Sequence, residues 1–372
     1  MAEPLKTFFS PALVRRIAAD VARASPSFPS PAFVARATRG LDALELLDRA
    51  KQIARALADH LPADFPAAIR VLLASLGPEH ATDELVGAGM APFYYLPHTI
   101  FVAERGLDHF ALSFQAQYEL TKRFTAEWSV RAFIARDPER TFAQLRAWAT
   151  DENAHVRRLV SEGTRLRLPW ASRVAWLDEN PHRILELLEL LKHDSASLVR
   201  RSVANSLNDL SKVDADLTVE TCRQWLSSAS PETEALVRHA LRSLVKKGHR
   251  GALSLLGAGA RPRVELGASR LSSRSVRLGG EIRFSFDLAS TARRPQDLVV
   301  DYAVHFIKAN GSPRPKVFKL KRIKLGPNEI ASFEGKVSFT DLTTRRHYPG
   351  PHRIEALVNG VAFPVGELHV RA

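Results

Sequence analysis

The sequence is short of cysteine, of long apolar runs and of acidic residues. Its single cysteine, Cys222, cannot form an intramolecular disulfide and cannot supply a metal cluster that needs several thiolates. No segment reaches eighteen consecutive apolar residues, and charges interrupt residues 1–24, which have neither the apolar core of a signal peptide nor the length of a membrane span. We expect a cytoplasmic protein without a membrane-spanning segment.

Motifs that bind common cofactors are missing as well. The sequence contains no HExxH, CxxC, GxGxxG or GxxxxGK[ST] pattern, and its 13 histidines show no ligand-like spacing. We therefore expect neither a metal nor a cofactor. His98 lies in an aromatic stretch, and we interpret it as a hydrogen-bonded structural residue.

The shortage of acids leaves a large positive charge. Lys and Arg number 53 against 40 Asp and Glu, which gives a net charge of +13 and a pI near 10.1. Such an excess favours an anionic partner, either nucleic acid or an acidic membrane surface. The excess is uneven, because residues 261–372 hold 20 Lys and Arg against 10 Asp and Glu.

The residue pattern changes near position 260. Before it, Leu and Ala recur every three or four positions, as in residues 45–61 and 184–193, which is typical of amphipathic helices. After it, apolar and polar residues alternate between Gly, Pro and Asn turns, which is typical of strands. The sequence therefore predicts a multidomain protein with an all-α domain over 1–255, a linker over 256–262 and an all-β domain over 263–372.

A repeat is visible inside the helical part. Residues 151–167, 194–212 and 230–248 each open with polar residues, continue with Val-Arg-Arg or Val-Arg-His, and end in a helical pattern. Their valines, at positions 156, 199 and 237, are 43 and 38 residues apart. These periods indicate paired-helix repeats of the HEAT type, which stack into a solenoid with a concave groove.

The repeat arginines allow two interpretations. Arg157, Arg200 and Arg238 follow the valines directly, and they could form a structural ladder with acids of neighbouring repeats. Arg158 and Arg201 lie about 100° further round the helix, where they are better placed to face the groove. A basic groove of this width would suit a nucleic-acid duplex.

One carboxylate lies inside a cluster of guanidinium groups. Within residues 155–170, Glu162 has Arg158 four positions before it and Arg165 three positions after it, and Trp170 follows Pro169. On a helix, both arginines lie on the same face as the acid. Their charges should lower the pKa of Glu162 and keep it ionised at neutral pH.

Three blocks carry a resemblance to a known family. Residues 94–134, 155–170 and 202–212 resemble the AlkC branch of the AlkC/AlkD DNA glycosylases, which are built from HEAT-like repeats, and SEGTRLRLPW is the most specific block. The β-rich tail resembles the immunoglobulin-like domain of some members. The resemblance implies an all-α HEAT-like repeat solenoid followed by an all-β immunoglobulin-like sandwich. It also implies a groove that bends the duplex and reaches the lesion without a deep pocket.

The resemblance also implies a function in base excision repair. The expected enzyme is a monofunctional, monomeric DNA glycosylase that binds alkylated double-stranded DNA and hydrolyses the N-glycosidic bond of 3-methyladenine and 3-methylcytosine. A base methylated at N3 is already cationic, so it leaves without a general acid. The tasks that remain are to stabilise an oxocarbenium-like sugar and to position a water, and ionised carboxylates suit both.

Two further acids match the active-site positions of the family. These are Glu127 and Asp209, which complete a catalytic set with Glu162. If successive repeats line one groove, the three carboxylates converge. The alternative for Glu127 is a local ion pair with Arg123 or Arg131, which lie four residues away on either side.

Two aromatic residues adjoin the acids. Trp128 follows Glu127, and Trp170 follows the Glu162 block. Either ring could attract a cationic base through a cation–π contact, or it could pack in the core instead. At the position of Trp128, the family pattern usually has phenylalanine.

Cations in two parts of the chain are the expected DNA contacts. Arg158, Arg165 and Arg201 would hold phosphates in the groove. In the β-domain, the expected contacts are Lys316, Lys319, Arg345 and Arg346, which lie in basic strands and turns. The alternative for these four is a solubilising surface.

Two functions from different classes fit the sequence. The first is the glycosylase, and the second is a non-catalytic HEAT-repeat scaffold that binds nucleic acid or protein. The three acids with adjoining tryptophans favour the glycosylase. The sequence leaves open the preference between the two bases, base flipping, the degree of DNA bending, and which carboxylate positions the water.

Overall fold

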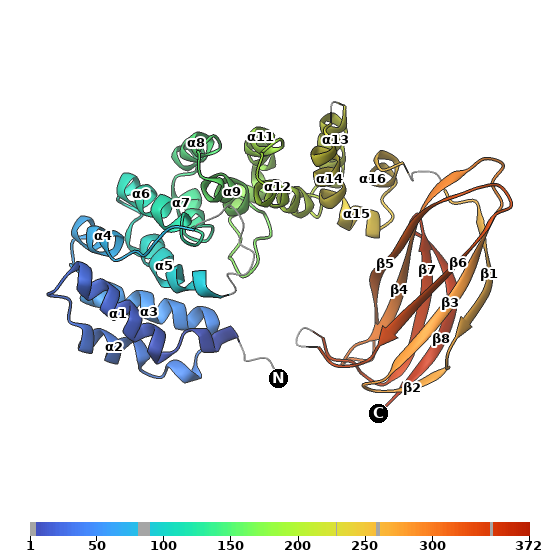
Figure 1. Ribbon diagram of the computed structural model, residues 1–372, viewed down its shortest axis with the longest axis horizontal. Helices are drawn as coiled ribbons and strands as arrows, with labels where there is room; N and C mark the ends of the chain where they lie inside the picture. The colour runs from blue at the N-terminus through green and yellow to red at the C-terminus, as the bar shows by residue number, and fades with distance from the viewer. Residues whose placement is uncertain (1–4, 81–89, 228, 258–260, 343–344) are drawn as a thin grey trace. The chain divides into compact units, whose positions relative to one another are not determined.

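The computed structural model places helices in the first part of the chain and strands in the second. The last helix ends at Leu255 and the first strand begins at Val264 (Figure 1). All helices among the described residues are too short or too polar to cross a bilayer. The structure describes residues 5–80, 90–227, 229–257, 261–342 and 345–372.

The contacts divide the chain into two units that do not follow residue order strictly. The first unit contains residues 1–213 and 229–240, and the second contains residues 214–228 and 241–372. The final helices therefore belong with the strands. The passage from helix to strand falls in the expected linker, whose residues 258–260 lie outside the described residues.

Among the described residues, the first unit opens with seven α-helices, most of them amphipathic. Capping residues set the start of two of them. The side chains of Ser10 and Asp64 each accept a hydrogen bond from a backbone N–H in the first turn of the helix that follows. These helices are α1 (Pro11–Ala24), α2 (Ser30–Thr38), α3 (Leu46–His60), α4 (Phe65–Ala74), α5 (Leu96–Arg105), α6 (Phe110–Thr121) and α7 (Ser129–Arg136).

Helix pairs follow, as the repeat predicts. Valines 156, 199 and 237 are fully buried, each in the second helix of its pair. The second helices lie side by side, since α9 packs on α12 and α12 packs on α14 (Figure 1). The elements are α8 (Pro138–Trp148), α9 (Ala154–Gly163), a short α10 (Ala175–Glu179), α11 (Pro181–Leu191), α12 (Ser197–Leu210) and α14 (Pro231–Ala240).

The first arginine of two repeats makes the same structural contacts. Arg157 donates to the carbonyls of Asp151 and Glu152, and Arg200 donates to those of Asp194 and Ser195, six and five residues before each arginine. Arg157 also forms a two-pronged ion pair with the Asp194 carboxylate of the next repeat, at 2.6 and 2.9 Å. The ladder interpretation is therefore correct for Arg157, while Arg238 lies exposed.

The second unit combines three helices with a β-sandwich. The helices are α13 (Ala215–Leu226), α15 (Arg242–Lys246) and α16 (Arg250–Leu255). Cys222 lies buried on α13, and burial raises the pKa of its thiol to about 12. Gly248, at φ +72°, approaches Gly360 so closely that a Cβ on Gly248 would lie 2.9 Å from the Gly360 Cα. Arg322 donates to the Leu256 carbonyl, which also ties this helical end to the strands.

The sandwich has one sheet of three strands and one of five. The strand orders are β1-β3-β6 and β2-β8-β7-β4-β5. Alternate residues of β3 and β4, such as Phe286 and Val304, fill the core between the sheets. The strands are β1 (Val264–Leu271), β2 (Ser275–Arg277), β3 (Glu281–Ser290), β4 (Gln296–Ile307), β5 (Pro313–Leu325), β6 (Ile330–Ser338), β7 (Gly350–Val358) and β8 (Val361–Arg371).

The basic segment of the β-domain forms an edge strand. β5 pairs only with β4, and the register between them shifts at Asp301, where Leu320 is left without a partner residue. The carboxylate of Asp301 accepts the Leu320 backbone N–H, which satisfies the group that the bulge leaves unpaired. Edge strands rich in Lys resist pairing with other chains, so the charge of β5 has a structural use as well.

Candidate active site

The structure brings the three predicted acids of the helical domain together. Glu127 lies in the turn before α7, Glu162 in the last turn of α9, and Asp209 in the last turn of α12. Because the helices pack side by side, their carboxyl-terminal ends and the turn before α7 meet on one face of the unit. The prediction that three carboxylates converge is confirmed geometrically.

Positive and negative groups alternate along a row through the site. Arg158 reaches Glu127 at 3.4 Å and Glu162 at 3.7 Å. Arg165 reaches Glu162 at 2.6 Å and Asp209 at 2.8 Å. The charged row, as we call it, runs in the order Glu127, Arg158, Glu162, Arg165, Asp209 and Lys212, the last pair lying 2.8 Å apart.

Glycine and a buried arginine hold the end of α9 in place. A Cβ on Gly163 would lie 2.6 Å from a methyl group of Val130 on α7, so only glycine allows the helix to end this close. α9 stops there, well before Pro169, and Arg165 reaches Glu162 from the loop that follows. Arg131 donates to the carbonyls of Gly163 and Arg165 at 3.0 and 2.8 Å, which fixes that loop. The local ion pair considered for Glu127 is absent from the described contacts of Arg131, whose side chain points to these carbonyls instead.

Glu162 also receives a hydrogen bond from a neighbouring helix. The Ser202 hydroxyl on α12 donates to Glu162 at 2.6 Å, and the Ser161 hydroxyl on α9 lies 2.7 Å from the Ser202 oxygen. One carboxylate oxygen of Glu162 therefore faces Arg165, while the other faces Ser202 and Arg158.

The two glutamates have different affinities for protons. Burial alone would raise the pKa of Glu162, but Arg158, Arg165 and the Ser202 hydroxyl outweigh it and hold the pKa below its ordinary value. Burial raises the pKa of Glu127, and the charge of Glu162 raises it further, while Arg158 opposes both effects. Glu162 is therefore the acid that stays ionised, and Glu127 is the one that takes up a proton more readily.

A cavity of about 270 Å³ lies beside these acids. Glu127, Glu162 and Arg158 form its charged side. Its apolar side consists largely of four aromatic rings from three separate segments: Phe93, the pair Phe124 and Trp128, and Trp170. Such a lining suits a flat, positively charged ring system.

Trp170 has an unusual backbone conformation at the rim of this cavity. Its φ is +63°, in the left-handed region that side chains other than glycine, Asn and Asp seldom adopt. The side chain is 56% exposed, and its ring meets those of Trp128 and Phe93 edge-on, at 6.4 and 6.5 Å between centroids. The core-packing alternative is therefore wrong for Trp170, whereas Trp128 is half-buried.

Comparison with known proteins places this chain in a family. The model of the DNA alkylation repair enzymes matches residues 123–244, and that of the YhaZ C-terminal Ig-like domain matches residues 265–372. The protein YhaZ of Bacillus subtilis is 39% identical over 260 residues, which cover 70% of this chain and 72% of YhaZ. The Pseudomonas fluorescens alkylpurine DNA glycosylase AlkC, solved with DNA that contains an abasic-site analogue, is 36% identical over the full length of both chains, with a TM-score of 0.90.

The chain belongs to the AlkC family of DNA alkylation repair enzymes. The predicted resemblance and the predicted fold, helical repeats followed by an immunoglobulin-like domain, are both confirmed. Within the described part of the chain, no group of three His, Cys, Asp or Glu side chains is arranged to hold a metal ion.

Two residues that the sequence predicts to act in the site are buried more deeply than those roles require. Arg165 and Asp209 are both buried and bind each other, and neither lines the cavity. The guanidinium of Arg165 is engaged with two carboxylates, so its surroundings argue against the phosphate contact expected from the sequence. Asp209 is held between Arg165 and Lys212. By contrast, Arg158 lines the cavity, and Arg201 is exposed on α12 without a partner among the described residues.

The four β-domain cations of this AlkC-family chain lie in different surroundings. The Lys316 ammonium lies 5.5 Å from the Phe318 ring, and the Arg345 guanidinium lies 5.0 Å from the Phe306 ring. Partial burial lowers the pKa of Lys316, and the nearby charge of Arg345 lowers it further, so these two cations form one cluster. Lys319 pairs in register with Asp301 instead, and Arg346 is exposed.

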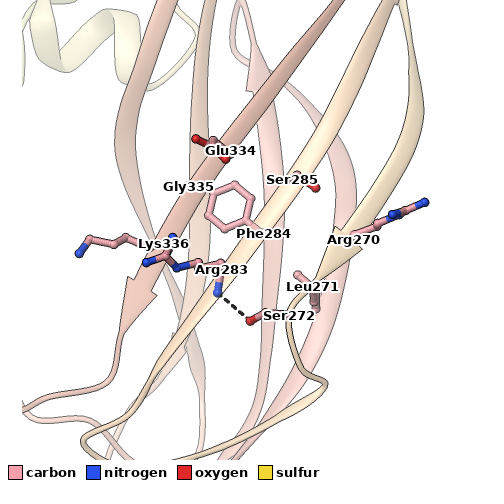
Figure 2. Close-up of a pocket in the computed structure, with 9 residues that line it drawn as sticks. All are labelled: Arg270, Leu271, Ser272, Arg283, Phe284, Ser285, Glu334, Gly335 and Lys336. Atoms are coloured by element: carbon pink, nitrogen blue, oxygen red, sulfur yellow. Dashed lines mark hydrogen bonds between the residues drawn. The ribbon is translucent and has the colours of Figure 1, made fainter.

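The three-stranded sheet carries a separate hollow of about 640 Å³ (Figure 2). Arg270, Arg283 and Lys336 surround it, while the Phe284 ring lies over Gly335, where a Cβ would approach the ring to 2.4 Å. The hollow is wide and shallow, and no residue predicted from the sequence to act in the site lines it. It does, however, supply exposed cations that are independent of the Lys316 cluster.

Several residues of the site were missed from the sequence. Ser202, Arg131 and Lys212 make direct contacts to the acids or to their loop, and Phe93 and Phe124 line the cavity. Ser202 carries a usable signal, because it lies seven residues before Asp209 and therefore on the same helix face. The phenylalanines carry no such signal, since aromatic residues between helices are usually core.

Proposed function

We propose that this protein is a monofunctional DNA N-glycosylase that removes 3-methyladenine and 3-methylcytosine from double-stranded DNA, acting as a monomer in the cytoplasm. Membership of the AlkC family supports a DNA glycosylase of alkylation repair in general. The observation that carries the finer proposal is the cavity that joins two carboxylates to four aromatic rings. Aromatic faces and carboxylates both attract cations, and bases methylated at N3 are cationic in DNA.

The chemistry needs no acid on the base. When the bond between C1′ and the base nitrogen breaks, its electron pair neutralises the positive charge of the base, which leaves as a neutral molecule. The sugar becomes oxocarbenium-like and takes the oxygen of a water at C1′, and the water loses a proton. A preorganised negative charge beside C1′ lowers the barrier to this step.

The two glutamates that line the cavity divide these tasks in our proposal. Glu162, held ionised by Arg158, Arg165 and Ser202, stabilises the positive charge that develops on the sugar. Glu127, whose pKa is raised by burial and by the charge of Glu162, accepts the proton of the attacking water. Asp209 acts through Arg165, which it orients toward Glu162.

The proposed grip on DNA uses cations of both units. In the helical repeats, Arg158 and Arg201 would contact phosphates next to the lesion. In the β-domain, Lys316, Lys319, Arg345 and Arg346 would add affinity without contributing to bond cleavage. Phosphate contacts of this kind position the duplex, while the cavity selects the base.

Release of 3-methyladenine from methylated DNA tests the proposal. Purified protein without added metal should release the free base, and Glu162→Gln should lower the single-turnover rate by about 10²-fold or more while DNA affinity and thermal unfolding stay unchanged. Glu186→Gln, an exposed acid that pairs with Arg146 on an outer helix, is the matched control. No release by the wild type, with intact DNA binding, would favour the scaffold function instead.

A further inference from the structure

Two serine hydroxyls connect neighbouring helices next to Glu162. Ser202 donates to Glu162 at 2.6 Å, and its oxygen lies 2.7 Å from that of Ser161. Both serines are buried, at 2% and 0% exposure, so water does not compete for these contacts. A hydroxyl has a single proton, and since Ser202 gives its proton to Glu162, the hydrogen bond between the serines must be donated by Ser161.

This arrangement restrains one particular oxygen of Glu162. Arg165 contacts the Oε1 atom, and Ser202 contacts Oε2, the atom that also faces Arg158 at 3.7 Å. Arg158 is shared with Glu127 and lines the cavity, so it can shift when DNA arrives. Ser202 is fixed on α12 and bound on both sides. It is therefore the neutral contact that keeps Oε2 in place independently of the arginine.

We propose that Ser202, supported by Ser161, is a positioning residue that fixes the Glu162 carboxylate for excision. The inference rests on the proposed function, because Glu162 must act in excision for its orientation to matter. Ser202 itself is placed by the repeat: it lies on the face of α12 that packs against α9, two turns before Asp209. The same face of α12 therefore supplies Ser202, which contacts Glu162, and Asp209, which contacts Arg165.

The same hydrogen bond favours the ionised form of Glu162. Other charges that face this carboxylate are Arg158 on α9, Arg165 in the loop after α9 and Glu127 before α7. The arginines favour ionisation and Glu127 opposes it. Because the pKa of Glu162 is lowered and that of Glu127 is raised, Glu162 causes the decline of the pH–rate profile at the lower pH, and this decline is the acid limb that concerns Ser202. Removing the Ser202 hydroxyl should shift it to higher pH, because Glu162 then takes up a proton more easily.

Single-turnover excision by the full chain tests the inference. Ser202→Ala should lower the rate by about tenfold at neutral pH, the scale of one hydrogen bond to a charged group, and should move the acid limb to higher pH. Affinity for DNA with an abasic-site analogue should not change. Ser202→Thr, which retains the hydroxyl, should recover most of the rate.

Ser206→Ala is the matched control. Ser206 is buried one turn further along α12, and its hydroxyl has no hydrogen-bond partner among the described residues, so its removal tests the cost of losing a buried hydroxyl alone. Its rate and pH profile should equal those of the wild type. Ser161→Ala should give a smaller loss than Ser202→Ala, and the double variant should be no slower than Ser202→Ala, because Ser161 acts only through Ser202.

The possible outcomes separate this inference from the proposed function. If Ser202→Ala matches Ser206→Ala in rate and pH profile while the wild type excises normally, the positioning role is wrong. A rate loss without a shift of the acid limb, or with an equal loss of DNA affinity, would also overturn it. If the wild type releases no base, the proposed function itself fails.

Discussion

The pKa values of Glu127 and Glu162 shift in opposite directions because the two side chains have different neighbours. Glu162 touches two guanidinium groups and a hydroxyl, whereas Glu127 has one guanidinium at 3.4 Å, the Thr125 hydroxyl at 2.9 Å and a second carboxylate nearby. Both acids could be selected from the sequence, since their spacing from the arginines and the family blocks could be read directly, and the structure places both beside the cavity. The division of labour that we propose for them could not be predicted, because the pKa shifts behind it depend on burial and on Ser202, which comes from another helix.

Glu127→Gln provides a test of that division. Glutamine cannot accept the proton of the attacking water, so the excision rate should fall by about 10²-fold. The pH–rate profile should lose the decline that Glu127 causes and keep the decline at lower pH, where Glu162 takes up a proton. The wild-type rate should decline as the pH is lowered through the raised pKa of Glu127, because protonation removes the base. The measurement is single-turnover excision between pH 5 and 9. A Glu127→Gln profile that keeps the decline at the higher pH would assign that decline to another group.

Trp170 has a strained backbone and an exposed side chain, so its replacement should lower activity without lowering stability. Trp170→Gly and Trp170→Asn place residues that tolerate φ +63° at this position, and thermal unfolding should occur at the same or a higher temperature than in the wild type. Excision should fall by about tenfold, because the cavity loses one ring of its lining. Wild-type activity in both variants would show that excision does not need the Trp170 ring.

His98 shows how a structural residue can differ from expectation. It is buried among Tyr94 and Tyr95, but its Nδ1 has no hydrogen-bond partner among the described residues, so that atom does not have the expected hydrogen-bonded role. Burial lowers its pKa from 6.5 to about 4. Between these values the unfolded chain binds a proton that the folded chain does not, so the free energy of unfolding falls as the pH falls.

His98→Phe should remove this pH dependence. The wild type should lose up to about 3 kcal/mol more stability than the variant between pH 7 and pH 4, since one pKa unit corresponds to about 1.4 kcal/mol. Urea unfolding of both proteins at several pH values measures this difference in stability. Glu162 and the other groups that both proteins share contribute equally, so their effects cancel. Parallel stability curves for the two proteins would contradict the prediction.

At the scale of elements, the repeat could be predicted from the sequence in unusual detail. The valine and arginine positions located α9, α12 and α14, because a buried valine recurs at a fixed place in each pair, and the arginine after it makes the same carbonyl contacts in α9 and α12. The end of α9 could not be predicted, since it depends on the close approach of Gly163 to Val130. The bounds of β1 and β5 could not be predicted, because few of their residues are buried and their patterns are too polar to stand out.

Two adjacent arginines on α9 should affect different properties of the protein when they are removed: Arg157 its stability, and Arg158 its excision activity and DNA affinity. Arg157→Ala breaks a buried pair with Asp194 and two carbonyl contacts, and it should lower the free energy of unfolding by about 3 kcal/mol with little effect on excision by the folded protein. Arg158→Ala should leave stability nearly unchanged and reduce excision and DNA affinity. Urea unfolding and excision assays on both variants make the comparison. Similar stability losses in the two would mean that Arg158 also belongs to the ladder.

At the scale of the whole molecule, most of the net positive charge lies in the β-domain. The cluster around Lys316 and Arg345 and the pair on the other sheet, Arg270 and Arg283, offer a comparison at equal charge. Lys316→Ala with Arg345→Ala should weaken binding to any duplex and should reduce the slope of log affinity against log salt by about 2, since each phosphate contact contributes about 0.9. Single-turnover rates at saturating DNA should be unchanged.

Arg270→Ala with Arg283→Ala is the control for that experiment. It removes the same net charge from exposed positions around the hollow of the three-stranded sheet (Figure 2). Its salt slope should remain close to that of the wild type. Equal effects of the two double variants would mean that the domain attracts DNA by net charge alone, and that Lys316 and Arg345 make no particular contact.

The charged row has a consequence for turnover. Its three acids and three bases sum to zero, so the site neither repels a phosphate backbone nor holds a neutral ring by charge. A methylated base in DNA brings one extra positive charge, which the aromatic cavity and the two glutamates favour. Cleavage returns the bond's electron pair to the base and cancels that charge. In the proposed reaction, cleavage therefore removes the attraction that selects the substrate, and we expect the excised base to be released without a separate step to expel it.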